Sequence, residues 1–364
     1  MQNPGVYWSE ATAELKRKVS HWPNRDLFIF AMATACNIFL VAKLMYVLQV
    51  LQCTRSSMQK VHRICAMFIW KSSWEPMKRA NLFRRIPLGG VGLAHLFVRK
   101  LVLRFFFLRD IEQPFMRTVI QTKLAWHLPA FLVSGYEEQS SKIGGFLREV
   151  VDAYNFLSVR FSREFLSCVN RRGLSHALYD TLFPEPLYRA VHTKSPGQDV
   201  LCRVKKMAIQ PRAKSFFFKL HTSTLPVKAW LHEKGIFVPW TTNCLLCKTP
   251  ETIEHVFIFC WDAFLFWDVL QRTFKKDLKI ASQSIRFLPI TSHERVPYDL
   301  IMLVGLYSIW CSRMAVRNAD LNPRPVEAYF VEFVTQIRCT YSDHDVVPQW
   351  VIEYEKLCEK SKFM

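Results

Sequence analysis

Hydrophobic positions recur with helical spacing along most of this chain. In residues 6–22, Ala13, Leu15 and Val19 are separated by charged and polar residues, and Pro23 ends the pattern. This spacing places the apolar side chains on one face of a helix, which can pack against a neighbouring helix. We therefore predict that residues 6–22 form the first helix.

Two further helices are expected before residue 75. Asp26 is placed to cap a second helix that runs to about residue 50, and Thr54 or Ser56 to cap a third that continues through 65–74. Asp, Ser and Thr suit these positions because their side-chain oxygens accept hydrogen bonds from the free N–H groups of the first turn. Three helices with short connections predict a small antiparallel bundle.

Proline and glycine interrupt the helical pattern at several places. Residues 86–93 contain one proline and three glycines, which predict a loop before a helix over 94–110. Residues 129–145 and 184–199 are rich in Pro, Gly, Ser and Thr, so we expect linkers or long surface loops there. Amphipathic helices are expected near the end of the chain, over 297–317, 324–341 and 347–359.

Residues 27–51 form an apolar stretch long enough to span a bilayer, for which about 20 apolar residues suffice. Asn37, Lys43 and Gln49 interrupt it. A lysine near the middle of a lone span is costly, and the same positions fit a helix buried on most sides of a bundle. We expect a buried core helix; a membrane span and an interfacial helix are the alternatives.

The composition indicates a packed and strongly basic protein. Half of the residues are hydrophobic, which excludes disorder for most of the chain, and the formal net charge is +19. Residues 1–110 hold 17 Lys and Arg against five Asp and Glu, which gives +12. Such a balance favours polyanions as partners, either nucleic acid or an acidic membrane surface. The first third of the chain is the candidate polyanion-binding surface.

Eleven cysteines are scattered through the chain, and the sequence shows no signal peptide. An odd, dispersed set of cysteines is not a disulfide framework. We therefore expect an intracellular, reducing compartment in which most thiols are buried as small hydrophobic side chains.

Cys244, Cys247, His255 and Cys260 follow the pattern C-x2-C-x7-H-x4-C. Two cysteines at this spacing suit a turn in which both thiolates approach one ion, and the other two ligands complete a tetrahedron with no open position. We predict one structural Zn²⁺, which contributes folding energy. Five residues separate His255 from Cys260, or roughly 140° on a straight helix, so we expect His255 at or before a helix start and Cys260 on its first turns. The alternative is three buried cysteines and a histidine satisfied by other groups.

Basic residues cluster in two regions that suit phosphate binding. Lys and Arg side chains that neutralise phosphates release counterions, which supplies affinity for nucleic acid of any base sequence. In the first third the candidates are Lys16, Arg17, Lys18, Arg25, Lys78, Arg79, Arg84 and Arg85. Ahead of the zinc ligands they are Lys205, Lys206, Arg212, Lys214 and Lys219, around Phe216, Phe217 and Phe218. Aromatic rings between basic side chains suit the binding of single-stranded nucleic acid, because the rings stack on bases while the charges contact phosphates. The simpler alternatives are basic side chains that are only solvated and phenylalanines that are buried in the core.

The stretch from Arg212 to Trp267 resembles the zinc-binding domain that follows the polymerase in non-LTR (LINE-type) retrotransposon reverse transcriptases. The likeness includes a basic and aromatic lead, a Leu-Pro before a helix, C-x2-C, a Glu before the histidine, H-x4-C and a tryptophan. The residues that carry it, besides the first two cysteines, are Lys214, Phe216, Phe217, Leu225, Pro226, Trp230, Glu254, His255, Phe259, Cys260 and Trp267.

The first 110 residues resemble the thumb that follows the palm in the same enzymes. Trp22, Tyr46, residues 68–70 and the glycine-rich turn 89–93 carry this likeness. The resemblance implies that the basic surface of this region follows the backbone of a template–primer duplex.

The chain departs from these enzymes in its chemistry. Their palm carries an aromatic-Ala-Asp-Asp motif, and this sequence has no Asp-Asp pair and nothing that resembles their endonuclease. We expect no catalytic centre and no cofactor besides Zn²⁺, in the C-terminal part of a longer polyprotein. Residues 89–92 lack the spacing of a P-loop, and residues 343–345 (Asp-His-Asp) read as a solvated turn rather than a metal or acid–base site.

We therefore predict four parts: a thumb-like basic helical bundle (1–110), a helical connector with loops (111–200), a zinc-binding domain (201–275) and a C-terminal helical bundle (276–364). The expected activity is nucleic-acid binding, with element RNA, target DNA and the remaining polyprotein as partners and no membrane. The resemblance extends the expected compartment to the nucleus. An active reverse transcriptase and a zinc-stabilised helical protein-interaction module are the alternatives.

Overall fold

The computed structural model describes residues 4–22, 26–124, 128, 143–190, 198–239, 241–290, 297–319, 322–342 and 351–352. Within these ranges the chain forms helices and loops, with no strand and one isolated β-bridge between Asn243 and Pro250. The predicted mainly α fold is confirmed. The chain divides into two compact units, residues 1–25 with 30–186 (unit 1) and residues 26–29 with 187–364 (unit 2). The finer division into four parts stays a prediction.

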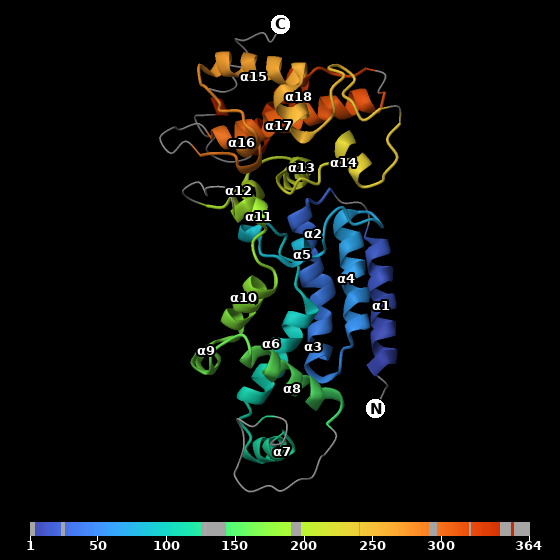
Figure 1. The fold of residues 1–364 in the computed structure, drawn as a ribbon, viewed down its shortest axis with the longest axis vertical. Helices are drawn as coiled ribbons and strands as arrows, with labels where there is room; N and C mark the ends of the chain where they lie inside the picture. The colour runs from blue at the N-terminus through green and yellow to red at the C-terminus, as the bar shows by residue number, and fades with distance from the viewer. Residues whose placement is uncertain are drawn as a thin grey trace. The chain divides into compact units, whose positions relative to one another are not determined.

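Unit 1 begins with the expected helices. They are α1 (Pro4–His21), α2 (Ile29–Ala35), the π-helical turn η1 (Cys36–Val41), α3 (Ala42–Val50) and α4 (Arg55–Trp70). α1 packs along α4, and the two lie side by side in Figure 1. Thr54 caps α4, because its hydroxyl accepts a hydrogen bond from the backbone N–H of Ser57 at 3.2 Å. Asp26 was the wrong cap, since α2 starts three residues later and the N–H of Ile29 donates to the Ser215 hydroxyl.

The apolar segment from Ile29 to Val50 is less buried than the sequence predicts. It is one of two helical segments in the described residues that are long and apolar enough to cross a membrane, and only 39% of its most apolar window is buried. Phe30, Leu40 and Leu48 face the core, whereas Phe39 and Tyr46 are exposed. The expectation of burial on most sides is therefore wrong, because neighbouring helices cover one face of the segment.

The remaining elements of unit 1 are α5 (Ala80–Phe83), the 3₁₀ turn η2 (Ile86–Leu88), α6 (Leu96–Arg109), α7 (Pro114–Leu124), α8 (Gly145–Ser158), α9 (Arg163–Cys168) and α10 (Arg171–Leu182). The loop predicted over 86–93 is present, with a single short turn. Gly90 is required in it, because a Cβ at this position would lie 2.0 Å from the carbonyl oxygen of Arg84. α6 packs against α3, α8 and α10 and is the central helix of this unit.

A buried arginine fastens α6 to its neighbours. Arg104 is fully buried, and its guanidinium donates to the carbonyl oxygens of Leu48, Gln49 and Leu51 at the end of α3. It also pairs with the Glu149 carboxylate of α8 at 2.9 Å. The carbonyl groups at the end of a helix have no hydrogen-bond partner within the helix. The Arg104 side chain supplies that partner to α3, and the Glu149 carboxylate of α8 neutralises its charge.

Unit 2 is arranged around one long helix. Its elements are α11 (Leu187–Ala190), α12 (Val200–Lys206), α13 (Pro211–His221), α14 (Lys228–Glu233), the π-helical turn η4 (His255–Phe259), α15 (Trp261–Phe274), α16 (Ser282–Phe287), α17 (Tyr298–Arg317) and α18 (Val326–Ser342). α17 contacts α13, α16, α18 and η4. It is the second segment of membrane-spanning length, but 72% of its most apolar window is buried. The helices predicted at 297–317 and 324–341 are confirmed, whereas most of 347–359 and all of 343–345 lie outside the described residues.

Candidate metal centre

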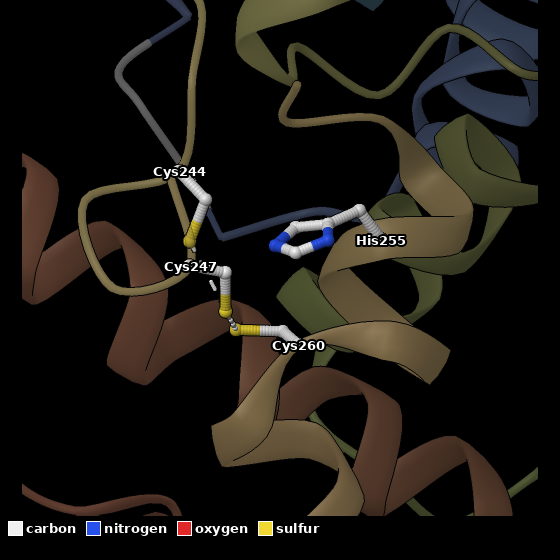
Figure 2. A group of neighbouring side chains, drawn as sticks. All are labelled: Cys244, Cys247, His255 and Cys260. Carbon is white, nitrogen blue, oxygen red and sulfur yellow. Dashed lines mark hydrogen bonds between the residues drawn. The ribbon is translucent and has the colours of Figure 1, made fainter. Parts of the chain in front are cut away.

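The first two predicted ligands lie in a tight turn. The backbone N–H of Cys244 donates to the carbonyl of Thr249 at 2.7 Å, and the N–H of Lys248 donates back to the carbonyl of Cys244 at 3.1 Å. Lys248 has a φ of 60°, in the left-handed region that a turn of this kind needs. The turn directs the sulfurs of Cys244 and Cys247 to the same side (Figure 2).

The other two ligands are joined by a π-helical turn. His255 begins η4, and the backbone N–H of Cys260 donates to the carbonyl of His255 at 2.7 Å, an i to i+5 bond. Cys260 then has extended backbone angles and is the N-cap of α15. His255 thus precedes the helix α15, as predicted, but Cys260 is the N-cap of that helix and not a residue of its first turns. The wider π turn brings residues five apart together, which a regular α-helix does not do.

The four ligand atoms have the spacing of a tetrahedral zinc site. They all lie within 4.8 Å of one another. The Cys260 sulfur is 4.0 Å from that of Cys244 and 3.7 Å from that of Cys247. Two sulfurs bound to one zinc at about 2.3 Å in a tetrahedron lie about 3.8 Å apart. Figure 2 shows the His255 imidazole directed at the three sulfurs, so the predicted ligands fit one zinc ion.

The ring of His255 is held for coordination through Nε2. Its Nδ1 lies 3.1 Å from the hydroxyl of Thr249, whereas Nε2 is buried and has no hydrogen-bond partner in the described parts of the chain. A buried nitrogen without a partner is unfavourable unless a metal takes its lone pair. This finding contradicts the alternative of a histidine satisfied by other groups. Burial lowers the pKa of the His255 imidazole, as does the nearby cation Arg313, and the neutral form is the one that binds metal.

Arg313 of α17 completes the surroundings of the site. Only 4% of it is exposed, and its guanidinium donates to the sulfur of Cys244 at 3.1 Å and to that of Cys260 at 2.7 Å. Three thiolates and Zn²⁺ together carry one negative charge, which this cation neutralises. Desolvation raises the pKa of the Cys244 thiol, but the backbone N–H of Cys247 and the guanidinium outweigh it, so the pKa lies below its ordinary value.

Sequence reasoning missed Arg313. The only signal was a basic residue within the long apolar helix predicted at 297–317. A buried arginine needs an anionic partner, but its spacing along the helix does not tell which residues supply the negative charge.

Most of the predicted phosphate-binding residues of unit 1 are either exposed or held in ion pairs. Lys16, Arg17 and Lys78 are exposed. Lys18 forms an ion pair with Glu14, Arg79 with Glu75 and Arg85 with Asp180. The pairs of Lys18 and Arg85 lie on the surface and are weak, so these two cations stay available to a stronger anion, whereas Arg79 donates two hydrogen bonds to the mostly buried Glu75 carboxylate. Arg25 lies outside the described residues.

Arg84 does not belong to a phosphate-binding surface. It is buried, and its guanidinium donates to the carbonyl of Pro184 at 2.7 Å and to the side chain of Asn81. These bonds tie the segment after α10 to the loop between α5 and α6. The guanidinium of Arg84 therefore stabilises the fold and is not free to bind phosphate.

In unit 2, Lys205, Lys206 and Arg212 are exposed, and Arg212 also pairs with Asp26 at 3.2 Å. Lys214 is buried, with its ammonium group donating to the carbonyl of Lys205 at 3.0 Å, so it also leaves the predicted surface. Lys219 is half-buried, and burial lowers the pKa of its ammonium group. The rings that were candidates for base stacking are all in the core: Phe216, Phe217 and Phe218. The simpler expectation of buried phenylalanines is the correct one.

Comparison with known protein families supports the assignment of the metal centre. Residues 185–267 match the family described as zinc-binding in reverse transcriptase. This reverse-transcriptase zinc-binding domain contains all four ligands, and its first residues coincide with the start of the main segment of unit 2 at Leu187. The resemblance drawn from the sequence is confirmed for this stretch. A search of curated proteins gives no match.

The match also shows what the domain lacks when taken alone. It ends at residue 267, within α15, whereas Arg313 lies on α17. The side chain that neutralises the zinc site is therefore outside the matched residues, and the helices that follow the domain belong to the same compact unit.

Proposed function

We propose that this chain is a nucleic-acid-binding part of a non-LTR retrotransposon polyprotein, in which a structural zinc site organises unit 2. The observation that carries the proposal is the reverse-transcriptase zinc-binding domain, with its four ligands brought together around one point. The net charge of +19, most of it in residues 1–110, supports polyanionic partners. Element RNA and target DNA are the partners of this kind that a retrotransposon offers, beside the remaining polyprotein itself.

The role of zinc in this proposal is structural. All four positions of a tetrahedron are occupied by protein ligands, so no position is open for water or substrate. When bound, the ion supplies folding energy to the turn, to η4 and to the start of α15. Nucleic-acid binding then depends on exposed cations such as Lys16, Arg17 and Lys205, not on the metal centre.

The test is binding to short RNA and DNA across a salt series, on protein whose metal content is measured. We expect one zinc per chain, lost in Cys247→Ser, and an affinity whose logarithm falls with log salt by about 0.7 for each phosphate neutralised on a single strand. Lys16→Gln with Arg17→Gln should reduce this slope. Lys123→Gln with Lys279→Gln removes the same charge from exposed positions outside the predicted clusters and serves as control. Binding that is indifferent to salt would contradict the proposal.

A second candidate function rests on exposed apolar side chains beside the zinc site. Phe259 is 70% exposed and Trp261 65%, and Leu245, Leu246 and Phe264 are also exposed. A patch of this kind favours a protein-interaction module. Retention of a protein partner at high salt, together with no retention of oligonucleotide, would favour this candidate over nucleic-acid binding.

We also propose that the chain acts without a catalytic centre of its own. The family match covers a zinc-binding domain, and the sequence has no Asp-Asp pair of the kind that reverse transcriptases use to bind catalytic metal ions. Primer-extension assays with the purified chain should therefore give no incorporation of nucleotides, and incorporation would overturn this part of the proposal.

A further inference from the structure

Unit 1 contains a cavity that the zinc site and the predicted basic clusters do not explain. It lies between α6, α10 and the loop before α6, and has a volume of about 510 Å³. Pockets that bind small ligands typically measure about 300–1,000 Å³, so one small organic molecule fits. Its apolar wall includes the partly exposed side chains of Met45 and Leu103, which lie beside the buried core residues Phe83, Leu93 and Val102.

The walls of this cavity are held in place by hydrogen bonds over long sequence distances. The Asn37 side chain donates to the carbonyl of Gly92 at 2.9 Å and accepts from the N–H of Ala94 at 2.8 Å. The hydroxyl of Tyr179 on α10 accepts from the N–H of His95 at 2.7 Å. These bonds fix the loop against η1 and α10, so the cavity is built before a ligand arrives.

The rim of the cavity is strongly cationic. Arg99 of α6 and Arg172 of α10 line it, and neither guanidinium has an ion pair or hydrogen bond within the described residues. Arg171 also lines it and lies over the Phe106 ring at 5.4 Å. Arg85 lines the cavity as well and forms a surface ion pair with Asp180. Free guanidinium groups on two facing helices can form bidentate hydrogen bonds to one phosphate.

We propose that this cavity binds one nucleotide unit, with the base against the apolar wall and the phosphate held by Arg99 and Arg172. An inorganic anion alone would leave the partly exposed side chains of Met45 and Leu103 in contact with water, and an apolar ligand would leave the arginines without a partner. A nucleotide covers the apolar wall with its base and gives the two arginines a partner in its phosphate. The inference rests on the proposed nucleic-acid binding and adds a site to it. The same chemistry is offered by a free mononucleotide and by an unpaired nucleotide of a strand.

The first experiment compares AMP and UMP with adenosine and inorganic phosphate as probes, by calorimetric titration of the full chain. At least one nucleotide should bind more tightly than adenosine and than phosphate. Arg99→Gln with Arg172→Gln should weaken that binding by about tenfold or more, because charge-assisted hydrogen bonds are lost. The control pair Lys123→Gln with Lys279→Gln should leave it unchanged. Equal affinity in both double variants would overturn the proposal.

A second variant fills the cavity without changing its charge. Ser175 lines the pocket, and its hydroxyl donates only to the carbonyl of Arg171 in the same helix at 2.8 Å. Ser175→Trp should abolish nucleotide binding while the helical circular dichroism stays as in the unsubstituted chain. If this variant unfolds, the exposed Arg99 and Arg172 substitutions still decide the question.

Oligonucleotides separate the site from the proposed function. Retention of a single-stranded 10-mer that depends on Arg99 and Arg172, and on free space at Ser175, would identify an unpaired nucleotide as the ligand. Nucleotide binding without any oligonucleotide retention would keep the site for a free nucleotide and refute the proposed function. Salt-dependent oligonucleotide binding that all of these variants preserve, with no binding of AMP or UMP, would refute the site and keep the function.

Discussion

At the residue scale, the zinc site depends on a side chain far from its ligands in sequence. Arg313 follows Cys260 by 53 residues, yet its guanidinium contacts two of the three sulfurs. Groups that contact metal ligands orient them and adjust their charge, and their loss typically weakens metal binding by about 10- to 100-fold. Arg313 also joins the core helix α17 to the turn that carries Cys244.

Arg313→Gln should weaken zinc binding without removing any ligand. Two charge-assisted hydrogen bonds to thiolates are lost, and the site keeps a negative charge inside the protein, so we expect about a tenfold or larger increase in the zinc dissociation constant. Competition with a chromophoric chelator measures this change. Arg317→Gln is the matched control, because it removes a guanidinium from the same helix that donates to the carbonyl of Pro226 and contacts no cysteine. Similar zinc affinities in the two variants would contradict the role of Arg313.

A pair of buried histidines sets a second property at this scale. Nε2 of His62 accepts a hydrogen bond from the N–H of Leu96 at the start of α6, and its ring lies 4.5 Å from that of His95. Burial lowers the pKa of His62 to about 3, aided by the neighbouring His95 and by Arg79. Burial also lowers the pKa of His95 to about 4. Both rings are therefore neutral in the folded protein at pH 7.

Acid should destabilise the protein through these two rings. Each folded-state pKa is below the unfolded value of about 6.5, so their contribution is complete above pH 6.5 and falls as pH drops toward 4 and 3. The loss reaches about 1.4 kcal/mol per pH unit for each ring. His95→Phe keeps an aromatic ring among Phe83, Phe97 and Phe183 and should flatten the dependence of the free energy of unfolding on pH.

Urea unfolding at several pH values between 7 and 4.5 measures this effect. Loss of zinc in acid affects both proteins equally, so the difference between them isolates the histidine. An unchanged pH dependence in His95→Phe would show that this ring does not titrate on unfolding.

At the element scale, the packing of α17 on α15 requires a glycine in the middle of a helix. A Cβ at Gly305 would lie 2.8 Å from the Trp267 ring and 3.0 Å from the Phe266 ring. Trp267 cannot easily move away, because its indole N–H donates to the carbonyl of Phe257 in η4 at 2.9 Å. The glycine thus allows α17 to approach the helix that begins at the metal ligand Cys260.

Gly305→Ala distinguishes helix propensity from packing. Propensity alone predicts a gain of about 1 kcal/mol for alanine inside a helix. Overpacking costs about 1–3 kcal/mol, so we expect a net loss of roughly 1 kcal/mol in the free energy of unfolding. Gly144→Ala adds a Cβ with nothing within 4 Å of it, so this control should lose only the preference for glycine over alanine at the N-cap of α8, about 0.5 kcal/mol, in the same denaturation series. A stabilised Gly305→Ala protein would show that the two helices separate without cost.

At the scale of the whole molecule, the zinc site and its supporting residues all belong to unit 2. The four ligands, Arg313 and Gly305 lie within residues 187–364. Structural zinc contributes about 10–16 kcal/mol in small zinc-dependent domains, as much as the whole stability of a typical domain. The two units should therefore respond differently to metal removal.

Removal of zinc with EDTA should unfold the metal-binding turn, η4 and the start of α15, and leave unit 1 folded. Hydrogen exchange measured by mass spectrometry should show loss of amide protection in residues 241–274, with protection in α4, α6 and α8 unchanged. Cys247→Ser should reproduce the pattern without chelator. Loss of protection throughout unit 1 would mean that the zinc site stabilises the whole chain.

The sequence by itself determined the helices and the metal ligands of this protein. Apolar spacing located α1, α4, α17 and α18, because helix formation depends on residues a few positions apart. The spacing of Cys244, Cys247, His255 and Cys260 was sufficient to name a zinc site for the same reason, since all four lie within 17 residues. Both conclusions use local information, which the sequence carries directly.

Only the tertiary structure decided what depends on contacts between distant residues. The π turn before Cys260, the hydrogen bonds of Arg313 to the sulfurs and the cavity between α6 and α10 arise from packing. Packing also decided that Arg84 and Lys214 are buried and used within the fold, although in sequence they look like the exposed Lys16 and Lys205. The physical reason is that periodicity places a side chain on one face of a helix, whereas the neighbouring helices determine which faces are covered.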